Sequence, residues 1–241
     1  MRAVEIARAG GPSVLRVKTG DDPTPGADEV RIRVAAAGLN FADVMARMGL
    51  YPDAPKMPCV VGYEASGTID AVGSAVKGLA VGDRVLALTR FGGQADVLCV
   101  PQKQVRRIPD RMTFEEAAAI PVNYVTAYHM IHRVAPVRKR SRVLVHMAAG
   151  GVGIAAIQLL RAIPEVVIFG TASASKHEQL RAWGVHHTID YRTLDYAEEI
   201  RKLTNGRGVD VVLDALGGAD WKKGYDLLAP AGHLVAFGFA N

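Results

Sequence analysis

The stretch that decides the fold is Val143-Leu144-Val145-His146-Met147-Ala148-Ala149-Gly150-Gly151-Val152-Gly153. An apolar run leads into a loop of small residues, and the following Ile154-Ala155-Ala156-Ile157-Gln158-Leu159-Leu160 has apolar residues at helical spacing. In the phosphate-loop pattern G-x-G-x-x-G, Ala148, Gly150 and Gly153 take the three glycine positions. We therefore predict a strand, a loop and a helix whose N-terminus holds a pyrophosphate, with the contacts made by Gly150, Gly151, Val152 and Gly153.

The rest of the second half repeats this alternation of apolar runs and amphipathic segments. Further strands are predicted at 166–172, 187–191, 209–216 and 233–240, and helices at 176–184, 196–203 and 221–229. Near-continuous apolar strands that alternate with helices indicate a doubly wound parallel sheet covered on both faces. The sequence thus predicts an α/β fold with five parallel strands.

The first 110 residues follow a different rhythm, because apolar and polar residues alternate at short spacing between glycines and prolines. This is typical of short, half-buried strands in a barrel or sandwich. After Pro109, Thr113 and Glu116 have the spacing of a capping box, and a helical pattern then begins. We predict a β-rich domain over 1–121 and a second domain over 122–241.

Composition narrows the class of protein. The chain has 241 residues, 49% hydrophobic and 22% charged, which is typical of a globular protein able to bury a large core. Its two cysteines, Cys59 and Cys99, cannot build a disulfide framework, so we expect core thiols and a cytoplasmic location. Apolar runs are shorter than the roughly 20 residues of a membrane-spanning helix.

The chain has a net charge of +5, and part of this charge is concentrated in one short segment. Four basic residues gather in Arg138-Lys139-Arg140-Ser141-Arg142, just before the strand at 143–145. We expect a solvated connecting loop there, with contact to an anion or a peripheral membrane surface as the alternative. The distribution does not indicate a nucleic-acid partner.

The end of the second strand predicts which nucleotide the loop prefers. An NAD site places an acid about 20 residues after the glycine loop to bond the ribose 2′-hydroxyl. This sequence instead has Thr171, Ser173 and Lys176, whose hydroxyls and charge suit a 2′-phosphate. We therefore predict NADPH over NADH. In the alternative interpretation, Ser173 or Ser175 caps the next helix and Lys176 is a surface charge.

Several separated motifs resemble the medium-chain dehydrogenase/reductase superfamily. They are the A-A-G-G-V-G loop, Ala37-Gly38-Leu39-Asn40-Phe41-Ala42-Asp43 and Gly62-Tyr63-Glu64-Ala65-Ser66-Gly67. The first of these upstream motifs, followed by Arg47-Met48-Gly49-Leu50-Tyr51, is similar to the zinc-independent quinone oxidoreductases. Residues 170–178 and Ile189-Asp190-Tyr191 resemble the vesicle amine transport protein homologues of that group. The resemblance covers essentially the whole chain.

This resemblance implies a GroES-like domain over 1–121, a Rossmann domain over 122–241 and an active site in the cleft between them. At the positions of the catalytic zinc ligands of related enzymes stand Asn40, Tyr63 and Val122, which offer no thiolate or imidazole, so no metal site is expected. The implied activity is hydride transfer from NADPH to a quinone or an α,β-unsaturated carbonyl. The alternative is a non-catalytic NADPH-binding module that docks to a membrane or protein partner.

The resemblance also assigns roles to individual residues. Asn40, Tyr51 and Thr126 are expected on the nicotinamide side, as the catalytic set, and Ser173, Lys176 and Tyr191 around the adenosine phosphate. Further cofactor contacts are expected where two strands end, from Leu216, Phe237, Gly238 and Phe239.

Four upstream residues have structural interpretations. Asn40 and Asp43 have the spacing of a helix cap, and Tyr51 could anchor a loop. Glu64 is expected to pair with a basic residue.

The fold expected from the resemblance continues past the fifth parallel strand with a sixth strand and part of a dimer edge. We therefore expect this chain to be a truncated part of a homodimeric protein, with the activity belonging to the complete one.

Overall fold

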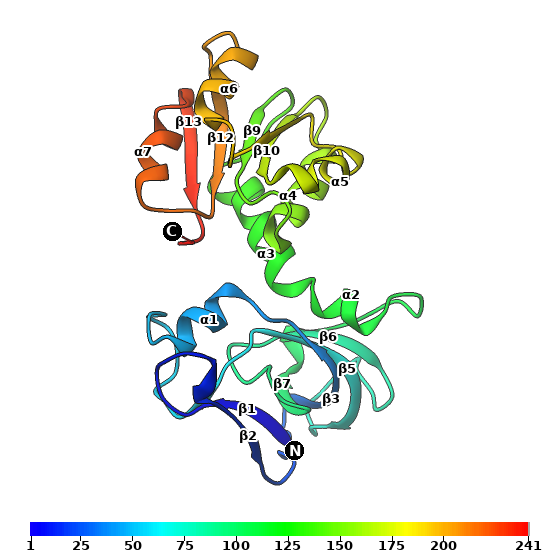
Figure 1. Cartoon of the computed structure of the whole chain (residues 1–241). Coiled ribbons are helices and arrows are strands. Elements are labelled where there is room, and N and C mark those ends of the chain that lie inside the picture. The colour runs from blue at the N-terminus through cyan, green and yellow to red at the C-terminus, as the bar shows by residue number, and fades with distance from the viewer. Residues whose placement is uncertain (241) are drawn as a thin grey trace. The chain divides into compact units, whose positions relative to one another are not determined.

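The computed structural model describes residues 1–240, and the chain divides into two compact units. The first unit is Met1–Val122, and the second runs from Asn123 onward. The boundary predicted from the sequence lies one residue earlier. Each unit has its own sheets and its own buried core, so each is described by itself (Figure 1).

The first unit is built from two antiparallel sheets. The larger sheet has the strand order β7-β3-β5-β6-β8 and the smaller one the order β2-β1-β4. The larger sheet consists of β3 (Glu29–Ala37), β5 (Glu64–Val72), β6 (Arg84–Leu88), β7 (Val97–Pro101) and β8 (Val105–Arg107). The smaller one consists of β1 (Arg2–Ile6), β2 (Leu15–Thr19) and β4 (Cys59–Val60).

Alternation of side chains makes the core of the larger sheet. In β3, Val30 and Ile32 are buried while Arg31 and Arg33 lie on the other face, which is the period of two expected for a half-buried strand. Short helices close the unit: α1 (Phe41–Arg47) follows β3, and α2 (Phe114–Ala118) packs on β3 and β5. The capping box predicted for α2 is present, since Thr113 and Glu116 exchange hydrogen bonds of 2.9 and 3.1 Å.

The second unit is built on one parallel sheet with the order β11-β10-β9-β12-β13. The chain therefore starts in the middle, builds outward on one side, and crosses back to build the other side. The strands are β9 (Arg142–Val145), β10 (Val167–Ala172), β11 (His187–Asp190), β12 (Val209–Asp214) and β13 (Leu228–Ala236).

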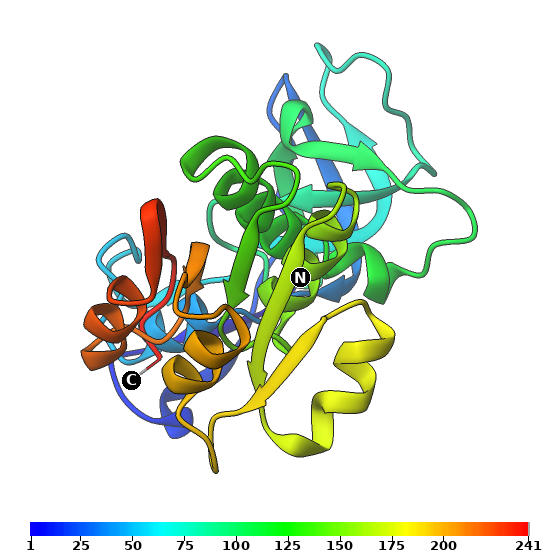
Figure 2. The same ribbon diagram turned by 90° about the horizontal axis from the view of Figure 1, so that it is seen from above.

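Helices cover both faces of this sheet, as Figures 1 and 2 show from two directions. They are α3 (Pro121–His129), which continues as a π-helical turn over Met130–Val134, α4 (Gly151–Arg161), α5 (His177–Ala182), α6 (Tyr196–Leu203) and α7 (Ala219–Tyr225). In β9, Val143 and Val145 belong to the cluster that contains α4, while Leu144 belongs to the cluster that contains α6. Both faces of β9 are buried, which explains its uninterrupted apolar sequence.

The predicted fold class is confirmed: a β-rich unit precedes a five-stranded parallel sheet with helices on both faces. Helix α1 was expected only in the alternative interpretation of Asn40 and Asp43 as a helix cap. Strand β4, which has two residues, was not predicted. No helix among the described residues has the length and apolar character to cross a bilayer.

A glycine on β5 provides a test of the packing in the first unit. Gly67 is buried between β3 and β6, and a Cβ atom there would overlap the carbonyl oxygen of Arg33. Because that oxygen belongs to the backbone of the neighbouring strand, we expect Gly67→Ala to lower the free energy of unfolding by about 1–3 kcal/mol. Urea denaturation monitored by circular dichroism measures this change.

Gly11→Ala is the matched control. A Cβ atom at Gly11 meets nothing within 4 Å, and the backbone there has φ −69°. The control should leave the unfolding midpoint unchanged, and equal effects of the two substitutions would contradict the proposed packing.

Candidate functional site

The turn that connects β9 to α4 is held tightly against the start of the helix. Met147 adopts a left-handed conformation with φ 49°, and its carbonyl accepts the Gly150 N–H at 2.8 Å. A Cβ atom at Gly153 would lie 2.5 Å from the same carbonyl oxygen. Only glycine fits at this point of the helix, so the close packing expected of Gly153 is present.

The first glycine of the phosphate-loop pattern is replaced by Ala148, and a neighbouring strand makes room for it. Ala148 is fully buried and its N–H donates to the carbonyl of Thr171 at 3.1 Å. On β10, a Cβ atom at Gly170 would lie 3.0 Å from the Ala148 methyl group. The methyl group therefore occupies space that β10 leaves open.

The N-terminus of α4 has the properties of an anion cradle. Gly150 is the N-cap in an extended conformation, and as a glycine it has no side chain of its own with which to cap the helix. The first-turn N–H groups of an α-helix have no partner within the helix, and the helix dipole places partial positive charge beside them. A Cβ atom at Gly150 would lie 3.2 Å from the Met147 carbonyl, which is a tight contact. The Asn123 side chain lies beside the next residue, since a Cβ atom at Gly151 would lie 2.6 Å from Asn123 Oδ1. Glycine backbone and one neutral amide therefore line this end of the helix.

The residues predicted around an adenosine phosphate follow β10 and β11. Ser173 precedes a 3-10 turn over Ala174–Lys176 but does not cap it with its side chain, and its Oγ lies 3.3 Å from Ser175 Oγ. Lys176 is exposed, and so is Tyr191, whose ring lies 5.9 Å from the guanidinium carbon of Arg192. The Ser173 hydroxyl is therefore not used for helix capping, which was the alternative interpretation.

Thr171 differs from these residues because its hydroxyl is turned into the protein. The residue is 3% exposed, and Oγ1 lies 3.1 Å from Nδ1 of the buried His146. Burial lowers the pKa of His146. A direct contact between the Thr171 hydroxyl and a ligand does not fit this geometry, whereas a supporting role through His146 does.

A buried acid that the sequence analysis missed holds the edge of the sheet beyond β12. Asp214 is fully buried, and its Oδ1 accepts the N–H groups of Leu216 at 2.6 Å and Gly217 at 3.0 Å. The signal available in the sequence was an aspartate that ends an otherwise apolar strand. This carboxylate shapes the loop that contains Leu216, one of the predicted cofactor residues.

The predicted residues after β13 lie beside the same loop. The Phe237 N–H donates to the Asp214 carbonyl at 2.9 Å, and a Cβ atom at Gly238 would lie 2.8 Å from the Ala215 carbonyl. Phe239 is half exposed, with its ring 6.1 Å from Trp221. The structure thus brings Leu216, Phe237, Gly238 and Phe239 to one corner of the second unit.

In the first unit, Asn40 and Asp43 do start a helix. Asn40 is the N-cap of α1, and its backbone N–H donates to Asp43 Oδ2 at 2.9 Å. The other carboxylate oxygen of Asp43 accepts the Gly62 N–H at 3.0 Å. Asp43 is 3% exposed, and burial raises its pKa despite these two hydrogen bonds. The helix-cap interpretation is therefore correct: Asn40 and Asp43 form a capping box, in which the Asn40 side chain faces the Asp43 backbone N–H. The Asn40 side chain also makes a second contact.

That contact is with Glu64, for which the expectation of a basic partner is wrong. Glu64 is 1% exposed; Oε1 accepts from Asn40 Nδ2 at 2.8 Å, and Oε2 accepts the Val122 N–H at 2.7 Å. Burial raises the pKa of Glu64, while these two hydrogen bonds oppose the rise. An amide and a helix N–H take the place of the expected cation.

Tyr51 and Thr126 lie in different units and have different surroundings. Tyr51 packs against a small core cluster, and its ring is 6.2 Å from that of Tyr63 in an edge-on arrangement. The Tyr63 hydroxyl is buried without a hydrogen-bond partner among the described residues, and burial together with Tyr51 raises the pKa of Tyr63. Thr126 is half buried on α3. The roles predicted for Tyr51 and Thr126 stay predictions.

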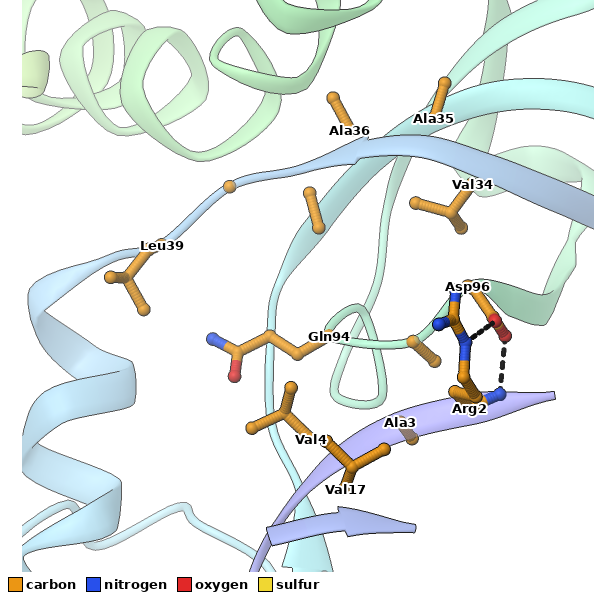
Figure 3. A pocket seen from close by; sticks show the side chains of 13 residues that line it. Arg2, Ala3, Val4, Val17, Val34, Ala35, Ala36, Leu39, Gln94 and Asp96 are labelled. Carbon is orange, nitrogen blue, oxygen red and sulfur yellow. Dashed lines mark hydrogen bonds and ion pairs between the residues drawn. The ribbon is translucent and has the colours of Figure 1, made fainter. Parts of the chain in front are cut away.

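An open hollow of about 460 Å³ lies elsewhere on the first unit, between β1 and β3 (Figure 3). Its walls are mostly valine and alanine, with an ion pair between Arg2 and Asp96 at 3.0 Å on one side. Leu39 lines it, whereas neither Asn40 nor Tyr51 does. The hollow is therefore separate from the predicted catalytic residues of this unit.

The basic loop before β9 is partly neutralised. Lys139 and Arg140 both form ion pairs with Glu165, at 2.8 and 2.7 Å. This agrees with a solvated connecting loop. Within residues 1–240, no three or more His, Cys, Asp or Glu side chains gather in a group that could hold a metal ion.

Comparison with protein-family models matches both units. Residues 26–110 match the alcohol dehydrogenase GroES-like domain, and residues 151–241 match the zinc-binding dehydrogenase domain. Among curated proteins, the synaptic vesicle membrane protein VAT-1 homolog of Danio rerio is 53% identical over 227 residues, which are 94% of this chain and 46% of the relative. The chain spans about half the length of the curated relatives it matches.

Solved structures agree with the family models. The CurK enoyl reductase has a TM-score of 0.93 at 38% identity, covering 98% of this chain and 74% of its own. The Escherichia coli quinone oxidoreductase complexed with NADPH has a TM-score of 0.93 at 32% identity, covering 99% of this chain and 73% of its own.

The buried Asp43 predicts a pH dependence of stability. Because burial raises its folded-state pKa above the ordinary value, this group contributes stability at low pH that is lost as pH rises through the raised pKa. Relative to Asp43→Asn, the unsubstituted chain should therefore gain free energy of unfolding as the pH is lowered from neutral toward the ordinary aspartate pKa of 3.8. Urea denaturation at several pH values measures the difference.

Asp70→Asn is the control for this experiment. Burial acts to raise the pKa of Asp70, but hydrogen bonds from Arg31 and Arg33 outweigh this effect and hold the pKa below its usual value. Because its folded-state pKa is lowered, Asp70 contributes stability that is lost as the pH falls, so the difference for Asp70→Asn should change in the opposite direction to that for Asp43→Asn. A difference for Asp43→Asn that stays constant, or that changes in the same direction as that for Asp70→Asn, would contradict the assignment.

Proposed function

Because the chain belongs to the zinc-independent, quinone oxidoreductase-like group of the medium-chain dehydrogenase/reductase superfamily, we propose that it is an NADPH-dependent reductase whose acceptor is a quinone or an α,β-unsaturated carbonyl. The two structural relatives described above are a quinone oxidoreductase and an enoyl reductase. Both acceptor types carry an electron-poor carbon conjugated to a carbonyl. The proposal therefore covers one chemical class of acceptor.

The observation that carries the proposal is the turn between β9 and α4. A pyrophosphate needs backbone N–H groups within reach, and the glycine-rich start of α4 offers them, with the neutral Asn123 side chain beside Gly151. At Gly153 a side chain would collide with the Met147 carbonyl, so the helix begins close against the strand that leads into it. The residues present fit a dinucleotide, with Gly150, Gly151, Val152 and Gly153 at its pyrophosphate.

The residues after β10 support NADPH in preference to NADH. No acid stands where β10 ends, and Ser173 and Lys176 follow it with side chains that have no structural role in capping. A lysine side chain favours a 2′-phosphate through its charge, whereas an NAD site uses an acid to bind the 2′-hydroxyl. We place Ser173, Lys176 and Tyr191 around this phosphate.

When bound, NADPH supplies the hydride that reduces the acceptor, which also takes up one proton. The chain's own part is to hold the two reactants and exclude water. Asn40, Tyr63 and Val122 offer neither thiolate nor imidazole, so their side chains are not a zinc ligand set. We propose Asn40, Tyr51 and Thr126 as contacts of the nicotinamide or the acceptor.

The central test is NADPH oxidation by the full chain with 9,10-phenanthrenequinone, followed at the nicotinamide absorbance, with Gly150→Asp as the variant. Aspartate is a favourable N-cap residue, and Gly150 has an ordinary extended conformation, so the fold should persist. Its carboxylate would stand where the pyrophosphate is expected. We expect Gly150→Asp to weaken NADPH binding by about a hundredfold or more and to abolish turnover.

Gly150→Asn separates charge from volume, because asparagine has nearly the same size and also caps helices. It should weaken NADPH binding less than Gly150→Asp does. Equal NADPH affinity in all three chains would overturn the site. NADPH binding without turnover over a panel of quinones and enones would instead favour a non-catalytic binding module.

Lys176→Ala tests the nucleotide preference. Removing the charge should weaken NADPH binding by about tenfold, equivalent to about 1.4 kcal/mol, and leave NADH binding unchanged. Fluorescence titration with both nucleotides measures the ratio. Lys222→Ala is the control, since Lys222 is exposed on α7 and pairs with Asp226 at 2.7 Å. A parallel loss of NADPH and NADH affinity in Lys176→Ala would contradict the 2′-phosphate assignment.

A further inference from the structure

Glu64 is a buried carboxylate that accepts hydrogen bonds from a side-chain amide and from a backbone N–H. Neither of these donors is a cation. The two oxygens of Glu64 are used separately: Oε1 accepts from the Asn40 side chain at 2.8 Å and Oε2 accepts from the Val122 backbone at 2.7 Å. Asn40 precedes α1, and Val122 lies in the first turn of α3. Two segments far apart in the sequence therefore meet at one side chain on β5.

The surroundings of Glu64 are built for this arrangement. A Cβ atom at Gly38 would overlap the Glu64 carboxylate, so the glycine before Leu39 and Asn40 leaves the space that the carboxylate fills. The Val122 N–H is one of the first-turn donors that α3 cannot satisfy itself, and a carboxylate is a favourable partner at that end of a helix. Glu64 is thus held in place from both sides.

A carboxylate in this position determines which way the Asn40 amide is turned. With Nδ2 toward Glu64 the contact is donor to acceptor, whereas the opposite orientation would set Asn40 Oδ1 against a carboxylate oxygen. The backbone of Asn40 is fixed independently by Asp43, which accepts its N–H. In the same capping box the Asn40 side chain faces the Asp43 backbone N–H, so an orientation with Oδ1 toward Asp43 and Nδ2 toward Glu64 satisfies both neighbours.

We propose that Glu64 is a positioning residue that orients the Asn40 amide for the acceptor side of the reaction. This rests on the proposed function, in which Asn40 contacts the nicotinamide or the acceptor. Glu64 itself is 1% exposed and acts through Asn40. One N–H of the amide is used by Glu64 and the side-chain oxygen faces the Asp43 N–H, so the remaining N–H is held in a fixed direction.

Glu64→Gln tests the orientation with little change in shape. The glutamine Oε1 can still accept from Val122, but its Nε2 faces Asn40 Nδ2, so the Asn40 amide must turn over to restore a hydrogen bond. We expect the melting temperature and NADPH affinity to stay close to those of the unsubstituted chain. We expect kcat/KM for 9,10-phenanthrenequinone to fall about ten- to hundredfold, as for a misplaced catalytic group.

Two further variants separate positioning from simple stabilisation. Gly38→Ala displaces the Glu64 carboxylate while leaving Asn40 and Glu64 chemically intact, and it should lower kcat/KM as Glu64→Gln does. The double variant Asn40→Asp with Glu64→Gln restores a hydrogen bond with donor and acceptor exchanged. It should keep a melting temperature close to that of the unsubstituted chain but should not restore turnover, because no amide remains at position 40.

Glu5→Gln is the matched control. Glu5 is the other buried glutamate of the first unit, 3% exposed, and pairs with Arg16 and Lys18 on β2. Its loss should leave kcat/KM unchanged even where the melting temperature falls. The proposal would be overturned if kcat/KM fell in proportion to the melting temperature across all these variants. It would also be overturned if kcat/KM were unchanged in Glu64→Gln.

A readout without turnover keeps the inference separate from the proposed function. The side-chain amide signal of Asn40 can be assigned by ¹⁵N–¹H NMR from its absence in Asn40→Asp. We expect that signal to move in Glu64→Gln and to stay in place in Glu5→Gln. If no acceptor on the panel is reduced, the proposed function fails. A shift in Glu64→Gln would then support the orientation of the amide, and an unmoved signal would overturn it.

Discussion

The second unit depends on one close approach, that of the α4 backbone to the turn that leaves β9. At Gly153 there is room for a hydrogen atom but not for a methyl group. This approach fixes where α4 begins relative to the end of β9, and therefore where its unpaired N–H groups lie. The neighbouring strand is adapted to the same turn, since Gly170 leaves space for Ala148. A cradle made of backbone then needs no charged side chain to attract a phosphate.

Much of this arrangement could be predicted because its causes are local in the sequence. The apolar run of β9, the glycine loop and the spacing of α4 are adjacent, and each leaves a clear pattern. The capping box of α2 is local in the same way. The strand β4 could not be found so easily, because its two residues make no periodic pattern and pair with β1 far along the chain. Helix α1 was ambiguous because Asn40, which has the spacing of a cap with Asp43, also belongs to the predicted catalytic set.

The partners of buried acids were the least predictable feature. Glu64 accepts from Asn40 and from Val122, 24 and 58 residues away, and no local pattern joins these three positions. A charged residue suggests a charged partner, but amide and backbone donors can stabilise a buried carboxylate when their geometry is good. Asp214 has local partners instead, since it accepts two N–H groups of the loop directly after it. That motif is short enough to be found from the sequence, and an acid ending an apolar strand was its signal.

Glu64 also bears on how this fold is used without a metal. In zinc-dependent relatives, three ligands converge on an ion, and the resemblance places Asn40, Tyr63 and Val122 at those positions. In this chain a carboxylate joins the first and third of them by hydrogen bonds. Such a connection holds the two segments together, but it cannot polarise an acceptor oxygen as a Lewis acid does. Under the proposed function the acceptor is already electron-poor, and the orientation of a neutral amide then matters more than the strength of a charge.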